Sequence, residues 1–451
     1  MTQTHSFTEG KILKPLLTFS LPILLALVLQ AAYGAVDLWV VGQFATAADV
    51  SAVSTASQLM QSVTTVITGL TMGATVMLGQ ALGQGRREEA GRMVGSVVTL
   101  FGMIAAVLTV TMVLCTAPLV TVLSAPQEAF TPTCDYVRWC SWGLIFITAY
   151  NVFGGIFRGI GDSKTPLITV AIACAVNVGL DLLLVAVFRM GAAGAAIATV
   201  AAQGVSVAAS FLLLKKRGLP FPVTRAELRP HGVYVRKTLL LGCPIALQDG
   251  LVSVSFLVIL AIINGLGLTA SAGVGVAEKV CAFIMLVPSS FMQSMSAFVA
   301  QNIGAGKPER ARKALYCCVA ASLCFGMIIG YASFFHGTVL TRFFMSDAVI
   351  AAAGADYLKA YAIDCLLTSF LFPFIGYFNG CGKTTFVMAQ GIIGAFCVRI
   401  PVSFLMSRLT PVSLFQVGLA TPCSTLVQIT LCGIVFLRMK REDEKRLGAA
   451  Q

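Results

Sequence analysis

Residues 15–44 read PLLTFSLPILLALVLQAAYGAVDLWVVGQF, an apolar stretch interrupted by a single charged side chain, Asp37. A helix of about 20 apolar residues crosses the hydrocarbon core of a bilayer with its backbone hydrogen bonds made internally. The stretch is longer than the apolar core of about 7–15 residues in a cleaved signal peptide, and no cleavage site is obvious. We therefore expect a first membrane helix that is retained.

The composition of the whole chain agrees with a membrane protein. Of its 451 residues, 57% are hydrophobic and 11% are charged, whereas soluble domains average roughly 45–50% and 25%. The net charge is +12, but Lys and Arg stand between apolar runs instead of along one solvated face, which argues against nucleic-acid binding. The histidines, His5, His231 and His336, are scattered, and the 14 cysteines include no C-x-x-C pair. We expect no enzymatic activity and no cofactor.

Hydrophobic runs separated by polar or Gly/Pro breaks predict an all-α integral membrane protein with about twelve transmembrane helices. The predicted helices are residues 15–44, 50–78, 93–123, 136–157, 166–188, 192–214, 238–263, 270–298, 314–336, 357–378, 386–407 and 414–437.

A long polar interruption divides the chain into two halves. Residues 215–237 contain Lys215-Lys216-Arg217 and three prolines. We predict an N-terminal lobe over residues 1–214 and a C-terminal lobe over residues 238–437, with residues 215–237 as a cytoplasmic linker. A basic cytoplasmic tail is predicted over residues 438–451.

The two halves resemble each other in sequence. GQALGQGR at residues 79–86 aligns with AQNIGAGK at residues 300–307, and FRGIG at 157–161 aligns with FNGCG at 378–382, both at an offset of 221 residues. Six helices return the chain to the side on which it started, so the halves are predicted to be parallel, pseudo-symmetric repeats around a central cavity.

The distribution of basic residues predicts the orientation. Of 31 Lys and Arg residues, 24 lie in the N-terminal segment, the even-numbered connections and the C-terminal tail. The positive-inside rule then puts both termini in the cytoplasm.

Asp37 and Asp181 are the first candidates for function, since a charged side chain in hydrocarbon costs about 3 kcal/mol on insertion scales. Asn177 precedes Asp181 by four residues and shares its helical face. Burial favours the neutral form of a carboxyl group, which would let these acids take up and release a proton. Carboxylate and amide oxygens at Asp37, Asn177 and Asp181 would equally suit Na⁺. An interhelical salt bridge is the structural alternative.

Further charged residues fall within predicted helices of the second half. They either line a cavity that binds substrate or pair with one another in salt bridges, and the salt bridge is slightly favoured. These residues are Asp249, Glu278, Lys279 and Arg399, together with Asp364.

An ordered set of motifs resembles the multidrug and toxic compound extrusion (MATE) family over nearly the whole chain, and the acids of the first lobe make it similar to the DinF-like subgroup. The motifs are Pro22 with Asp37, Gln-x-x-Gly-x-Gly after the second and eighth predicted helices, Arg158-Gly159-x-Gly161-Asp162-x-Lys164-x-Pro166, Asn177-x-x-x-Asp181, and Gly194-Ala195-Ala196-Ile197-Ala198-Thr199.

The resemblance implies a secondary active exporter, a cation antiporter that extrudes organic compounds in exchange for H⁺ or Na⁺ by alternating access. It also implies a coupling site in the first lobe at Asp37, Asn177 and Asp181, with Asn151 and Thr199 as neighbours. Lys279 and Arg399 make the second lobe more basic than a cavity built only for lipophilic cations, so anionic and zwitterionic substrates stay open alongside cationic ones. We expect a monomer in the plasma (inner) membrane, in contact with lipid and a small organic substrate.

The main rival within transporters is a flippase for lipid-linked cell-wall or polysaccharide precursors, which resembles this architecture. Such a cavity is expected to carry several basic residues for pyrophosphate, whereas the predicted helices here offer two, Lys279 and Arg399. A channel would need a repeated selectivity constriction, and an enzyme a convergent set of catalytic groups. Neither pattern is present in the sequence.

Overall fold

The computed structural model describes residues 7–123, 125–221, 227, 229–409 and 411–449. His5, linker residues 222–226 and 228, and the last two residues of the predicted tail lie outside the described residues. The described residues form helices joined by short connections, with no β-strand among them.

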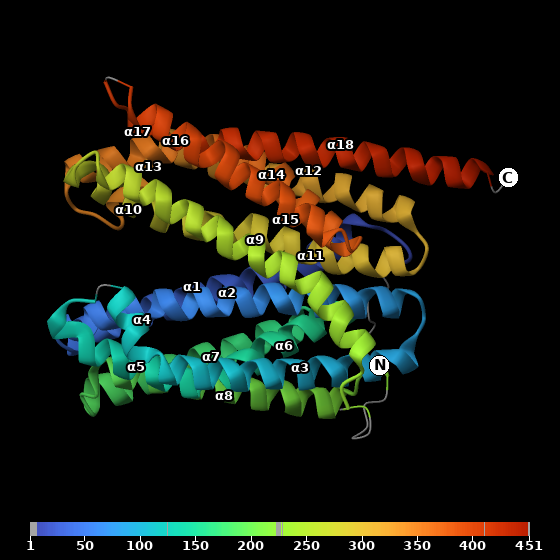
Figure 1. Ribbon diagram of the computed structural model, residues 1–451, viewed down its shortest axis with the longest axis horizontal. Coiled ribbons are helices and arrows are strands. Elements are labelled where there is room, and N and C mark those ends of the chain that lie inside the picture. The colour runs from blue at the N-terminus through green and yellow to red at the C-terminus, as the bar shows by residue number, and fades with distance from the viewer. Residues whose placement is uncertain (1–6, 124, 222–226, 228, 410, 450–451) are drawn as a thin grey trace. The chain divides into compact units, whose positions relative to one another are not determined.

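Where the structure describes the first half, it contains eight α-helices, and a π-helical segment, Leu182–Val187, directly continues the seventh. They are α1 (Leu13–Phe44), α2 (Ala47–Gly83), α3 (Arg87–Leu114), α4 (Thr116–Val122), α5 (Phe130–Trp142), α6 (Leu144–Ile160), α7 (Lys164–Asp181) and α8 (Gly191–Arg217) (Figure 1).

The described residues of the second half form ten α-helices, and a second π-helical segment, Ile393–Arg399, joins the seventh and eighth of them. They are α9 (Gly232–Asn264), α10 (Leu268–Ile284), α11 (Leu286–Gly304), α12 (Pro308–Phe335), α13 (Gly337–Arg342), α14 (Ala348–Gly380), α15 (Thr384–Ile392), α16 (Ile400–Ser407), α17 (Leu414–Gly418) and α18 (Ala420–Ala449).

The predicted membrane fold is confirmed. Within the described part of the chain, eleven helical spans are long and apolar enough to cross a bilayer, and a bent pair makes a twelfth. That pair, Gln127–Trp142 with Leu144–Ile160, is bent by 52°, where the sequence predicted one helix over residues 136–157. Gly143 stands at the bend, and a Cβ there would lie 2.3 Å from Val200 Cγ2. The close approach of α8 therefore requires glycine at the break.

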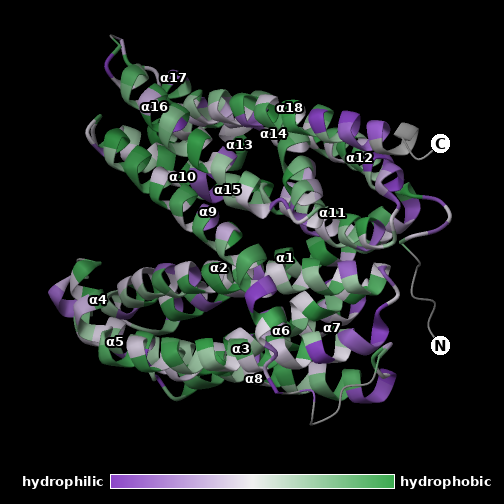
Figure 2. Ribbon diagram, turned by 45° about the vertical axis from the view of Figure 1, so that its right-hand side comes forward, coloured by the Kyte–Doolittle hydropathy of each residue, from purple (hydrophilic) through white to green (hydrophobic). Residues whose placement is uncertain are grey.

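The exposed surface of the helices is largely apolar. Val107, Leu212 and Ile328 each expose more than 60% of their surface, and Figure 2 shows hydrophobic residues along the helices with hydrophilic ones gathered toward many of the helix ends. Large apolar side chains in such numbers would be unfavourable in water, whereas hydrocarbon solvates them. The composition is thus explained by lipid contact and not by an unusually large core.

The chain divides into two compact units. The first comprises Met1–Ala246 with Ala300–Pro308, and the second comprises Leu247–Val299 with Glu309–Gln451. Each unit has its own hydrophobic core, which includes Met77 and Phe101 in the first and Ile259 and Tyr357 in the second. The predicted lobe boundaries at residues 214 and 238 stay a prediction.

One carboxylate in the first unit caps two helices. Asp49 and Thr46 form a capping box at the start of α2, with Thr46 Oγ1 donating to Asp49 Oδ2 over 2.7 Å. The other carboxylate oxygen, Oδ1, accepts a hydrogen bond from the backbone N–H of Ala192 at the start of α8, over 2.9 Å. The intervening Gly191 has φ +55°, and a Cβ there would lie 2.4 Å from Asp49 Oδ1. Glycine is therefore needed both for its backbone conformation and for its size.

The segment before α1 is anchored at the same end of the first unit as the ends of α6 and α11. Phe7 is buried at 1% exposure and packs edge-on against Phe19, with ring centroids 5.0 Å apart. Its backbone carbonyl accepts a hydrogen bond from Asn302 Nδ2 over 3.1 Å, and the next carbonyl, that of Thr8, accepts one from Lys307 Nζ over 3.0 Å. These contacts tie the N-terminal segment to the α11–α12 connection.

Candidate functional site

Asp37 lies on α1, inside the first unit, at 5% exposure. Thr199 on α8 donates a hydrogen bond from Oγ1 to Asp37 Oδ2 over 3.1 Å. The other carboxylate oxygen, Oδ1, has no hydrogen-bond partner within the part of the chain that the structure describes. Asp37 is thus oriented from one side, while its second oxygen is left available to a ligand.

Asn177 and Asp181 follow one another by a single turn of α7, and both are buried, at 1% and 0% exposure. Among the described residues, no hydrogen-bond partner is found for either carboxylate oxygen of Asp181 or for either polar atom of the Asn177 amide. Buried polar atoms are nearly always satisfied in folded proteins, so four such atoms in one place call for an explanation. A ligand that binds between these four atoms would be a sufficient explanation.

α1, α7 and α8 bring these side chains together. The carboxyl groups of Asp37 and Asp181 are near enough to interact directly, and Asn177 also lies beside Asp37, although its amide makes no hydrogen bond of good geometry. Two carboxylates at close range in a medium of low dielectric repel strongly unless a proton or another cation lies between them. The arrangement can hold one small cation.

The structure gives Asp181 a special place in the backbone, because α7 ends at this residue and the π-helical segment Leu182–Val187 begins. A π-helical turn widens the backbone spiral, and such turns are frequent at functional sites. The residues of the π-helical segment itself, LLLVAV, include no Pro or Gly that would have indicated the change.

Asn151 stands apart from the carboxyl pair. It lies on α6, where its Oδ1 accepts a hydrogen bond from Thr68 Oγ1 of α2 over 3.0 Å and its Nδ2 donates to the Ile147 carbonyl over 2.8 Å. Its side chain therefore joins α6 to α2. Of the five residues predicted for the coupling site, the structure groups four and gives Asn151 to this neighbouring contact.

Two residues beside the site were missed by the sequence reasoning. Gln203 Nε2 donates a hydrogen bond to the hydroxyl of Tyr33 over 3.2 Å. Tyr33 precedes Asp37 by four residues and Gln203 follows Thr199 by four, so each shares the helical face of a predicted site residue. Their spacing of four residues from a predicted site residue is the sequence feature that could have identified Tyr33 and Gln203.

The charged candidates of the second unit are not paired. Among the described residues, no carboxylate and basic nitrogen of Asp249, Glu278, Lys279 or Arg399 approach within the 4.0 Å of an ion pair, so the salt bridge that the sequence favoured is not formed. Arg399 is buried, Asp249 and Glu278 are half-buried, and Lys279 is exposed. Asp364, also buried, accepts a hydrogen bond from Thr425 Oγ1 over 2.6 Å.

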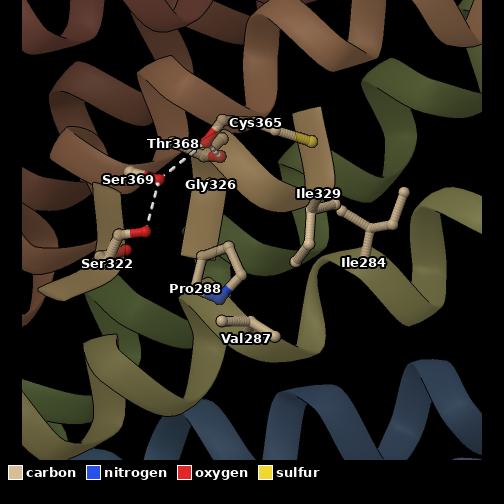
Figure 3. Close-up of a pocket in the computed structure, with 9 residues that line it drawn as sticks. All are labelled: Ile284, Val287, Pro288, Ser322, Gly326, Ile329, Cys365, Thr368 and Ser369. Atoms are coloured by element: carbon tan, nitrogen blue, oxygen red, sulfur yellow. Dashed lines mark hydrogen bonds between the residues drawn. The ribbon is translucent and has the colours of Figure 1, made fainter. Parts of the chain in front are cut away.

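A small cavity in the second unit lies between α10, α11, α12 and α14 (Figure 3). Its volume of about 10 Å³ leaves room for about one water molecule. Ser369 Oγ donates a hydrogen bond to the Ser322 carbonyl over 3.2 Å, and Ser322 Oγ has no hydrogen-bond partner among the described residues. The cavity is too small for an organic substrate, and none of the candidate charged residues lines it.

Comparison with known proteins supplies the context for these sites. The family model described as MatE matches residues 22–183 and again residues 244–405, an offset within one residue of that of the internal repeat. A second model, described as Lipid II flippase MurJ, matches residues 126–267.

Curated relatives cover almost the whole chain. The probable multidrug resistance protein YpnP of Bacillus subtilis (strain 168) is 27% identical over 413 residues, 90% of this chain and 91% of that protein. The probable multidrug resistance protein YoeA of the same organism is 25% identical over 448 residues, 95% and 94% of the two chains.

Solved structures share the fold. The outward-facing structure of a multidrug resistance MATE family transporter of the MOP superfamily matches with a TM-score of 0.91 at 19% identity, over 99% of each chain.

Proposed function

The chain belongs to the MATE family of multidrug transporters, and from this premise we propose that it is a secondary active exporter driven by cation antiport. It extrudes organic compounds, amphipathic or cationic, while H⁺ or Na⁺ enters, and the two lobes alternate access to a central cavity. We place it in the DinF-like subgroup because its buried acids Asp37 and Asp181 lie in the first half of the chain. It needs no cofactor and catalyses no covalent chemistry.

The observation that carries this proposal is the buried pair of Asp37 and Asp181, whose carboxyl groups keep three oxygen atoms without a hydrogen-bond partner. Ionisable groups inside a membrane protein are costly and mark ion pathways. A pair that lacks any basic partner within ion-pair distance among the described residues is suited to a cation that comes and goes. A permanent salt bridge would hold the acids in one state.

Each residue of the site has a role in this scheme. Asp37 and Asp181 bind the cation, Thr199 fixes the orientation of the Asp37 carboxylate, and Asn177 offers an amide oxygen beside it. Binding removes the repulsion between the two carboxylates, which lets α1 pack more closely on α7 and shifts the population of conformers in which the substrate is released. The change in packing is the coupling between ion and substrate.

Both H⁺ and Na⁺ suit these ligands. A proton shared between two carboxyl groups satisfies the pair directly. Na⁺ prefers several oxygen ligands, and the two carboxylates with the Asn177 amide would supply them. Transport measured under a pH gradient and, separately, under a Na⁺ gradient therefore identifies the coupling ion.

The setting in the cell follows the basic residues. We propose the plasma (inner) membrane, with both termini in the cytoplasm, where most Lys and Arg of the connections would lie. A groove of about 460 Å³ on α5, α6 and α8, lined by apolar side chains that include Trp139 and Phe146, supports contact with lipid chains. We propose a monomer as the working unit.

The test is transport of ethidium in everted vesicles under an imposed pH gradient and, separately, an imposed Na⁺ gradient. We expect Asp37→Asn and Asp181→Asn each to lower gradient-driven transport more than tenfold, with the wild type showing which ion drives it. Asp135→Asn is the matched control, since Asp135 lies at the surface in an ion pair with Arg138. Undiminished transport in both buried variants would refute the site.

A second candidate function is transbilayer movement of a lipid-linked precursor, which the match of residues 126–267 to the MurJ model favours. In proteoliposomes, such a protein would move a fluorescent lipid-linked pyrophosphate from one leaflet of the membrane to the other. It would not transport ethidium. The same preparation therefore separates the two functions.

A further inference from the structure

Arg399 is a buried cation in the second unit. It stands at the end of the π-helical segment Ile393–Arg399, two residues before Pro401, and is 6% exposed. A guanidinium keeps its charge at any physiological pH, so it cannot escape burial by losing a proton. Something must compensate its charge within the helix bundle.

The protein compensates Arg399 only in part. Among the described residues its one hydrogen bond runs from Nη1 to Ser255 Oγ of α9, over 3.3 Å. The Nε–H is buried and has no partner. No carboxylate within the described chain comes within ion-pair distance of the guanidinium.

The plane of the guanidinium is held by an aromatic ring. Arg399 Cζ lies 4.4 Å from the centroid of Phe256, which follows Ser255 on α9. Stacking on the ring and the bond from Nη1 leave the edge formed by Nε and Nη2 without a partner. This edge is one of the two that bind a carboxylate through paired N–H donors.

Acidic and phenolic groups surround the guanidinium at longer range. Asp364 of α14 interacts with it electrostatically, but its Oδ1 is already bonded to Thr425 of α18. Tyr357 and Tyr361 of α14 also lie near Arg399, and Glu278 of α10 lies near Tyr357. Asp364 offsets part of the charge from a distance and does not occupy the free edge.

We propose that Arg399 and Ser255 form a subsite for the carboxylate of a transported amphipathic compound. The proposal rests on the exporter function above and names a substrate class for it: compounds that carry a carboxylate on an apolar body. The unbonded edge of Arg399 receives the two carboxylate oxygens, Ser255 keeps the guanidinium in place, and the half-buried ring of Phe256 packs against the apolar part. Such a ligand supplies the contact that Asp364 does not make.

The experiment measures binding of dansylglycine and of its uncharged amide, dansylglycinamide, to the purified protein in nanodiscs by dansyl fluorescence. The two probes differ only in the carboxylate. We expect the wild type to bind dansylglycine at least tenfold more tightly than the amide. Arg399→Gln should bind the two probes equally, because its shorter side chain stays polar but loses the charge and the paired N–H donors of the guanidinium.

Further variants separate a binding role from a structural one. Arg408→Gln is the matched control, because Arg408 is exposed and lies over the ring of Phe404, and it should keep the preference for dansylglycine. Asp364→Asn should strengthen that preference by removing a nearby negative charge. If Arg399→Gln fails to fold, Arg399→Lys decides: it keeps the charge without the paired donors and should lose most of the preference.

Two results would overturn the proposal. The first is a wild type that binds both probes equally, and the second is an Arg399→Gln or Arg399→Lys variant that prefers dansylglycine as strongly as the wild type. Gradient-driven ethidium transport is measured on the same variants. Its persistence in Arg399→Gln would show that the exporter function stands whether or not this subsite does.

Discussion

Gly83 packs against the backbone of the segment that contains Gly304, and Gly304 packs against the backbone of the segment that contains Gly83. A Cβ on Gly83 would lie 2.1 Å from the carbonyl oxygen of Gln301, and a Cβ on Gly304 would lie 2.1 Å from the carbonyl oxygen of Gln80. The two glycines occupy the same place in the two sequence repeats, so one contact is made twice around the pseudo-symmetry. Backbone approach this close is available only to glycine.

The first prediction concerns this contact. Gly83→Ala and Gly304→Ala should each destabilise the protein by about 1–3 kcal/mol, because the added methyl group meets backbone atoms that cannot rotate away. The measurement is the melting temperature of the detergent-solubilised protein. Gly102→Ala on α3 is the control, since no atom lies within 4 Å of its Cβ position. Equal melting temperatures for all three variants would contradict the reciprocal packing.

The second prediction concerns Thr199. Its hydroxyl makes the one hydrogen bond of good geometry to the Asp37 carboxylate. Hydrogen bonds to charged groups contribute about 1.5–3 kcal/mol, so Thr199→Ala should weaken the apparent affinity for the coupling ion about tenfold or more. Thr199→Ser keeps the hydroxyl and should stay near the wild type. The ion concentration that gives half-maximal ethidium transport is the quantity to compare, and a Ser variant as impaired as the Ala variant would argue against the bond.

The third prediction concerns the double cap at Asp49. Asp49→Ala removes acceptors at the starts of α2 and α8 and should cost about 1–2 kcal/mol per cap. Gly191→Ala should also destabilise, because φ +55° and the Asp49 carboxylate both exclude a methyl group. Thermal melting of each variant tests this. Glu128→Ala, on the exposed 3₁₀ turn Gln127–Ala129 before α5, should melt as the wild type does.

The fourth prediction concerns Phe7. Phe7→Ala should destabilise the first unit by several kcal/mol, within the range of about 3–5 kcal/mol for a buried Phe, since the ring packs on Phe19 and lies 3.4 Å from the Cβ position of Gly161. Phe44→Ala is the control, because Phe44 is 49% exposed at the end of α1. Limited proteolysis near the N-terminus should become faster for Phe7→Ala alone, and equal cleavage of both variants would exclude an anchored segment.

The helices themselves were accessible from sequence because the bilayer imposes one rule on every span. The run at residues 15–44, apolar except for Asp37 and a few neutral polar residues, was predicted to be helical, and α1 spans Leu13–Phe44. The same rule fails for local geometry. Nothing in the hydropathy around Gly143 indicates a bend of 52°, and nothing after Asp181 indicates a π-helical segment. At Gly143 the close approach of Val200 on α8 was visible only in the structure.

The candidate site, too, was predictable from the sequence only in part. Asp37 and Asp181 could be identified from the sequence because a charged side chain inside a membrane helix is energetically costly. Tyr33 and Gln203 are neutral and carry no such signal, so their hydrogen bond was found only in the structure. Asn151, expected beside the acids, bonds to Thr68 instead, since the direction of its side chain on α6 depends on where α2 lies.

The sequence by itself determined that the chain belongs in a membrane, that about twelve helices span it, that the two halves repeat, and that Asp37 and Asp181 are buried. These follow from the free energy of transfer of each residue, which is a local property. Only the tertiary structure decided that Asp37 meets Asp181 and Thr199, that Arg399 is left without an ionic partner, and that Gly83 and Gly304 touch the opposite backbone. Those are distances between helices far apart along the chain, and they are set by how side-chain volumes fit together.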